Sequence, residues 1–336
     1  MFYDQESFNR WVASSKGPSS WPPDFGAIKG IWDDFQGAGV SKPADLDQFL
    51  TNHGGSDYTV KIFEDVLTCF REQSPFDSGR ISLGIVPIGR LEAYVSRVHD
   101  SLHCIVVDTY LESFLSFTCF TALACGFERP SAAEVERYTA GFFSQLDSYF
   151  GRGDWDPQSK LFHEMVTKNY NASVMASYTL TALNVFIFAH ELSHLALGHT
   201  KETKRLYAAD ASGKAVSHLS VFKHSHLQEF EADKFGMRVF LAFMNDPERW
   251  PTVKLERLYM MAPLFFFDLL DVYYIRYEAL FGSEFISPDH PSPAHRRQAI
   301  LQAYPEIRTD WSNSLYDGLG EVAQHFLENC SAPPTS

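Results

Sequence analysis

The stretch FAHELSHLALGH, residues 188–199, decides the expected fold because it contains the pattern HExxH as His190, Glu191 and His194. In a helix of about 3.6 residues per turn, His190 and His194 lie on one face, so both imidazoles can bind one metal ion. Glu191 follows the first histidine directly, where its carboxylate can reach a water on the metal without becoming a ligand. The pattern therefore predicts a helix that carries a zinc site.

The residues around HExxH favour this interpretation. The pattern lies at the end of the apolar run ASYTLTALNVFIFAHELSHLAL, residues 176–197. Burying three titratable side chains in such a run is costly unless a partner satisfies them, and a metal ion is such a partner. Histidines that are satisfied by hydrogen bonds in a protein core are the competing interpretation, and the pattern alone leaves it open.

A third ligand is expected in HLQEFEADKFGMRVF, residues 226–240, because a catalytic zinc ion usually has three protein ligands. Glu229 and Asp233 are four residues apart and share one helix face. With Glu229 as the ligand, Asp233 is placed to accept a hydrogen bond from a ligand histidine and fix its tautomer. Glu231 is the rival ligand, but it lies about 200° around the helix from Glu229, so one of the two faces the metal.

Two small residues in the same segment, Ala232 and Gly236, bear on how this helix packs. A solvated acidic helix face gives no reason for small residues at these positions. Close packing against the HExxH helix does, because small side chains let two helices approach. The sequence therefore predicts that the helix over 226–244 packs on the HExxH helix.

Taken together, HELSH and EFEADKFG resemble the gluzincin peptidases of the HtpX and CAAX-prenyl-protease clan, in which an ExxxD motif follows HExxH. A third element, DHPSPAHRR at residues 289–297, is similar to the His-Pro of that clan with an arginine six residues after the histidine. The resemblance covers about residues 172–300. The phage-exclusion Lit type of peptidase, which also uses HExxH, is a more distant comparison.

The resemblance implies a ligand set and roles for the other motif residues. It implies one zinc ion per chain, held by His190, His194 and Glu229, with Asp233 hydrogen-bonded behind the ligands. It also implies that His290 stabilises the oxyanion of the tetrahedral intermediate. Arg296 would support the site or the substrate carbonyl. The best-known members of the clan are embedded in membranes, whereas this chain has no convincing membrane span.

The expected fold is α+β and mainly helical, a zincin-like metallopeptidase with a small sheet and an HExxH active-site helix. Strands are expected at 80–87 and 103–107, and a polar loop at 200–224. Helices are expected at 45–52, 58–72, 109–125, 131–150, 172–197, 226–244, 253–281, 293–303 and 312–330. Residues 1–155 are expected to form a helical, small-sheet region and residues 156–336 the zinc metallopeptidase region, unless both form a single compact unit.

Composition restricts the class of protein. The net charge of −14 argues against nucleic-acid binding, which normally needs a basic surface. The five cysteines are scattered and odd in number, as in a protein with reduced thiols. The chain starts without a signal-peptide pattern and its apolar stretches are interrupted by polar residues, so a cytoplasmic protein without a membrane span is expected.

The other histidines offer weaker signals. His99 and His103 are four residues apart but precede a strand, so metal binding is not expected there. His218, His224 and His226 fall in the expected polar loop and should be solvated.

The predicted function is a zinc-dependent endopeptidase that hydrolyses peptide bonds of a protein or peptide substrate. Two alternatives stay open. One is a zinc-binding protein that acts by interaction or regulation, although such a site does not need Glu191 as a general base. The other is a latent peptidase that a regulatory partner activates.

Overall fold

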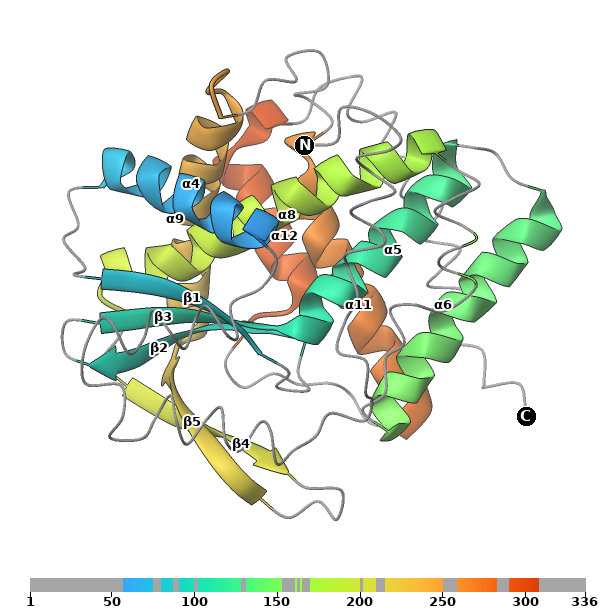
Figure 1. Ribbon diagram of the computed structural model, residues 1–336, viewed down its shortest axis with the longest axis horizontal. Helices are drawn as coiled ribbons and strands as arrows, with labels where there is room; N and C mark the ends of the chain where they lie inside the picture. The colour runs from blue at the N-terminus through green and yellow to red at the C-terminus, as the bar shows by residue number, and fades with distance from the viewer. Residues whose placement is uncertain are drawn as a thin grey trace. The chain divides into compact units, whose positions relative to one another are not determined.

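The computed structural model (Figure 1) describes residues 57–74, 80–86, 91–99, 102–127, 131–152, 161, 164, 170–199, 202–209, 215–249, 259–282 and 290–307. The chain divides into two compact units. The first unit comprises residues 1–22, 113–183 and 252–336, and the second comprises 23–112 and 184–251. Both combine segments from either side of residue 155. Residues 153–160 lie outside the described part, so the division expected there stays a prediction.

The sheet belongs to the second unit and has five strands in the order β1-β3-β2-β5-β4, as Figure 1 shows. β1 and β3 pair in parallel, and the other neighbouring strands pair antiparallel. β2 joins β5 through the pair Ser96 and Val221. The strand bounds are β1 Arg80–Val86, β2 Ala93–His99, β3 Leu102–Asp108, β4 Glu202–Ala209 and β5 Ala215–Lys223. The strands expected at 80–87 and 103–107 are thus confirmed as β1 and β3.

The expectation of a polar loop over residues 200–224 is wrong, because this segment forms β4 and β5. Strand β2 was not expected either. β4 and β5 pair with each other as a hairpin, and β2 pairs along its length with the neighbouring β3; the pair Ser96 and Val221 joins β2 to β5. Strand formation depends on the neighbours with which a strand pairs and packs, so a local pattern gives a weak signal for such polar segments. The segment between the two metal motifs therefore extends the sheet.

Helices α4 (Asp57–Gln73) and α9 (His226–Met244) pack with the end of α8 (Tyr170–Ala196) in the second unit. Helix α8 passes from the first unit to the second after Leu183. Aromatic rings from these helices pack against one another in the edge-on and tilted arrangements that aromatic pairs prefer. The pairs are Phe63–Phe188, Phe70–Phe235 and Phe186–Phe240. The last half of α8 is buried on all sides from Leu180 to Leu195. The HExxH pattern therefore lies on a core helix, as its apolar context predicts.

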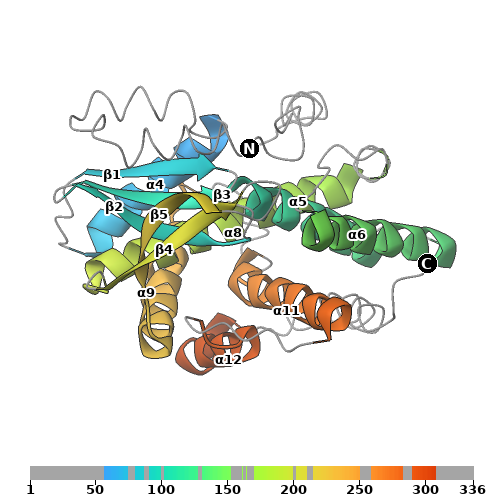
Figure 2. The same cartoon turned by 90° about the horizontal axis from the view of Figure 1, so that it is seen from below.

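The first unit is helical in its described residues. It contains α6 (Ala132–Arg152), α11 (Ala262–Phe281), α12 (Pro293–Ala303), a short 3-10 helix at Pro305–Ile307, and most of α5 (Thr109–Phe127). Ser131 and Glu134 exchange the hydrogen bonds of a capping box at the start of α6. Figure 2 shows α12 beside α11, where Arg297 pairs with Asp268 at 3.3 Å.

Most of the expected helices are present. Those at 58–72, 109–125, 131–150, 172–197, 226–244 and 293–303 are confirmed, and α11 matches the end of the one at 253–281. The helices expected at 45–52 and 312–330 lie outside the described residues. The described part of the chain is mainly helical with a small sheet, and it contains no helix both long and apolar enough to cross a membrane. Cys69, Cys104 and Cys119 carry free thiols, as expected.

Candidate metal centre

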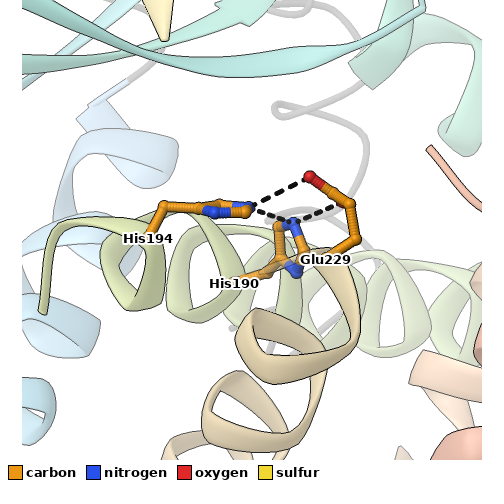
Figure 3. A group of neighbouring side chains, drawn as sticks. All are labelled: His190, His194 and Glu229. Atoms are coloured by element: carbon orange, nitrogen blue, oxygen red, sulfur yellow. Dashed lines mark hydrogen bonds and ion pairs between the residues drawn. The ribbon is translucent and has the colours of Figure 1, made fainter. Parts of the chain in front are cut away.

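Three side chains converge in the second unit, as Figure 3 shows: His190 and His194 from α8, and Glu229 from α9. The two histidine Nε2 atoms lie 3.1 Å apart. Glu229 Oε2 lies 3.4 Å from His190 Nε2, and Glu229 Oε1 lies 3.4 Å from His194 Nε2. All three side chains are buried, and their ligand atoms lie within 4.8 Å of one another. This group can hold a metal ion.

The donor atoms can be compared with those of a zinc site. Zinc binds imidazole nitrogen and carboxylate oxygen at roughly 2.0–2.1 Å, so two donors of one tetrahedron lie roughly 3.3–3.4 Å apart. The two histidine Nε2 atoms, 3.1 Å apart, agree with that value to within a few tenths of an ångström, and each of them lies 3.4 Å from a different oxygen of Glu229. Two imidazoles and one carboxylate that can surround one ion therefore fit zinc in the chemistry of their donor atoms.

Asp233 determines which nitrogen of His190 faces the centre. Its Oδ1 lies 2.9 Å from His190 Nδ1, the contact that the spacing of Glu229 and Asp233 predicts. An ionised carboxylate only accepts hydrogen bonds, so His190 donates its Nδ1–H to Asp233 and directs Nε2 at the centre, where a metal ion would replace the Nε2 proton. Burial lowers the pKa of His190, but the carboxylates of Asp233 and Glu229 outweigh it and raise this pKa to about 10.

Glu229 is positioned by the start of α9. The helix begins with a capping box in which the Ser225 side chain accepts from the Gln228 backbone N–H while Gln228 accepts from the Ser225 N–H. Glu229 stands in the first turn, where the helix dipole favours a negative charge. One turn further on, Asp233 meets His190. The cap and the four-residue spacing thus direct both carboxylates to the HExxH helix.

The other two glutamates of the motifs have different surroundings. Glu191 is buried, and its Oε1 lies 4.0 Å from His190 Nε2, close to the centre but further than the ligand oxygens. Glu231, the rival ligand, is half exposed and lies near His199. Glu229 is therefore the carboxylate that faces the centre, in agreement with the expectation that only one of the two does so.

Two histidines that the motifs did not single out lie against His194. His199 Nδ1 is 3.1 Å from His194 Nδ1, and His199 Nε2 is 3.1 Å from Glu231 Oε2. The ring of His224 stacks on that of His194 with centroids 3.6 Å apart and planes 15° from parallel. The expectation that His224 is solvated is wrong, because it is buried between the end of β5 and the cap of α9. A sequence signal existed for His199, which directly follows the helix-ending Gly198.

His290 and Arg296 belong to the first unit. Arg296 is buried on α12, with its guanidinium carbon 4.9 Å from the centre of the Phe267 ring. His290 is partly buried just before that helix. The roles in catalysis that the resemblance implies for these two residues stay predictions.

Comparisons with known proteins add no family to this description. No protein-family model, no curated protein and no solved structure matches the chain. The likeness to gluzincin peptidases therefore rests on the three motifs of the sequence alone.

Proposed function

We propose that the protein is a zinc-dependent endopeptidase of the gluzincin type. The observation that supports this most is the buried group of His190, His194 and Glu229, whose ligand atoms all lie within 4.8 Å of one another. Two imidazoles and one carboxylate favour zinc over magnesium or calcium, which prefer oxygen ligands. Three protein ligands also leave a fourth position for a substrate or a water, as in catalytic zinc sites.

Glu191 is the residue that turns a zinc site into a hydrolytic one. When bound, zinc supplies a Lewis acid that makes water acidic enough to attack near neutral pH. Glu191 takes the proton of the attacking water and delivers it to the leaving amine, so that the peptide bond breaks without free acid or base. Asp233 keeps His190 in the Nδ1–H tautomer throughout.

The first test is the metal content of the purified protein, measured by elemental mass spectrometry. We expect about one zinc ion per chain in the wild type and in Glu191→Gln. We expect its loss in His194→Ala. His226→Ala serves as the matched control, because His226 is an exposed histidine on α9. Wild-type protein that takes up no zinc after zinc is added contradicts the proposal.

The second test separates hydrolysis from metal binding. New protein N-termini are compared between extracts that were incubated with the wild type and with Glu191→Gln. Cleavages that need Glu191 support an endopeptidase and identify its substrates. A zinc-loaded wild type that produces none, alone or with cell extract as a source of activating partners, favours a zinc-binding interaction protein.

A further inference from the structure

The side of His194 that faces away from the donor centre is occupied by His199. The chain reaches this position through the end of α8, where Gly198 has a φ of +72°. The His199 N–H donates to the His194 carbonyl oxygen at 2.9 Å, and the Gly198 N–H donates to the Leu195 carbonyl oxygen at 3.1 Å. This is the Schellman arrangement, which brings the side chain after the glycine back against the last turn of the helix. The two side chains that meet in this arrangement, here those of His199 and His194, are commonly apolar. In this protein both are histidines.

The hydrogen bonds around His199 have one consistent direction. His194 directs Nε2 at the donor centre, so its proton resides on Nδ1 when Nε2 holds a metal. His199 Nδ1, at 3.1 Å, must then accept this proton donor. A neutral His199 consequently carries its own proton on Nε2, which lies 3.1 Å from a Glu231 oxygen that accepts. Each ring nitrogen of His194 and His199 thereby has a single role in this series of hydrogen bonds, which ends at Glu231.

We propose that His199 and Glu231 are positioning residues for the metal ligand His194. His199 accepts the hydrogen bond from His194 Nδ1, and Glu231 fixes the tautomer of His199 that can do so. The inference rests on the metal site of the proposed function and not on peptide hydrolysis. It gives each ligand histidine its own carboxylate: Asp233 acts on His190 directly, and Glu231 acts on His194 through an imidazole.

Asp233 and Glu231 differ in their exposure to solvent, and this difference explains why His199 lies between Glu231 and His194. Asp233 is fully buried, whereas the Glu231 side chain is 51 % exposed. His199 is buried and spans the distance between this solvated carboxylate and the buried ligand. The ring of His224 covers one face of His194 at 3.6 Å. His194 is thus held at one edge by a hydrogen bond and on one face by a stacked ring, which restricts its rotation.

The test is the zinc dissociation constant, measured by competition with a chelating dye, for a matched pair of variants. His199→Phe keeps a ring but loses the acceptor, and we expect zinc binding to weaken about 10- to 100-fold. His199→Asn keeps a polar acceptor near the position of Nδ1, and we expect an affinity within a few-fold of wild type. His226→Phe is the control for an exposed histidine. Wild-type affinity in a folded His199→Phe, or equal losses in both variants, overturns the proposal.

A second measurement uses the wild type and so does not depend on the variants folding. In the zinc-loaded protein with ¹⁵N-labelled histidine, NMR reports which ring nitrogen carries the proton. We expect His194 protonated at Nδ1 and His199 protonated at Nε2. A proton on Nδ1 of His199 overturns the proposal. A wild type that binds no zinc defeats the proposed function as well, whereas unchanged affinity in His199→Phe defeats this inference alone.

Discussion

Gly236 on α9 lies so close to His190 that a Cβ added to it would stand 3.0 Å from both the Cα and the N of His190. Backbone atoms cannot swing aside as a flexible side chain can, so a larger residue must push the two helices apart. We expect Gly236→Ala to lower the free energy of unfolding by about 1–3 kcal/mol, although alanine is the better helix former. Urea denaturation measures this. Lys234→Ala, at an exposed position of the same helix, should leave stability nearly unchanged.

Zinc should raise the thermal stability of the protein, because the donors come together in the folded chain and not in the unfolded one. At a free zinc concentration about 100 times the dissociation constant, the stabilisation is about 2.7 kcal/mol, or roughly 5 °C in midpoint temperature. Zinc must also displace a proton from the site, since the pKa of His190 is raised to about 10 in the metal-free protein. Calorimetry in buffers of different ionisation enthalpy should therefore detect proton release. A His194→Ala variant that gains as much midpoint temperature as the wild type contradicts this prediction.

In the first unit, Arg276 on α11 is buried and makes two hydrogen bonds to Asp147 on α6, at 2.6 and 2.5 Å. Removal of the carboxylate leaves a buried guanidinium without its main countercharge. We expect Asp147→Ala to cost about 2–3 kcal/mol, less than for a fully buried pair because Asp147 is partly exposed. The double variant with Arg276→Met should recover most of the loss in chemical denaturation. A double variant that is no more stable than Asp147→Ala contradicts this prediction, because the loss of stability would then come from packing and not from the unpaired charge of Arg276.

Asp271 on α11 is expected to make stability depend on pH. Burial and the neighbouring Asp268 raise its pKa to about 6, despite the opposing effect of Arg297. A carboxyl group with a raised pKa in the folded state disfavours folding once it ionises. Stability should therefore fall between about pH 4, where the unfolded chain ionises, and pH 6.

The variant Asp271→Asn removes this ionisation. We expect it to be more stable than wild type by about 1–2 kcal/mol at pH 7.5, after allowance for solvent screening, with the difference shrinking towards pH 4. Denaturation curves across this range measure the effect. A difference that stays constant from pH 4.5 to 7.5 contradicts the assignment.

The helices were predictable because their signals are local. Helix α9 spans residues 226–244 as expected, since an apolar pattern starts behind Ser225 and ends before a proline. Strands β4 and β5 were not predictable in the same way. They pair mainly with each other as a hairpin, and the pair Ser96 and Val221 joins β5 to β2. A short polar segment resembles a loop until the strands with which it pairs and packs are known.

In the candidate site too, some residues could be predicted from local spacing and others could not. His190, His194, Glu229 and Asp233 follow helical spacing, which places them on two faces that can meet. His199 and His224 depend on how the chain turns at the end of α8 and returns at the end of β5. The positive φ of Gly198 explains the first turn, and a glycine followed by histidine after HExxH is a pattern that reasoning from spacing alone passed over.

Strands β4 and β5 are formed by the chain that connects α8 to α9, and hence His194 to Glu229. An ion held by these two residues would tether both ends of this connection and turn it into a closed loop. A closed loop has fewer conformations to lose when it pairs with β2 than an open one has. Metal loading on the helices would therefore influence how readily the outer two strands of the sheet form.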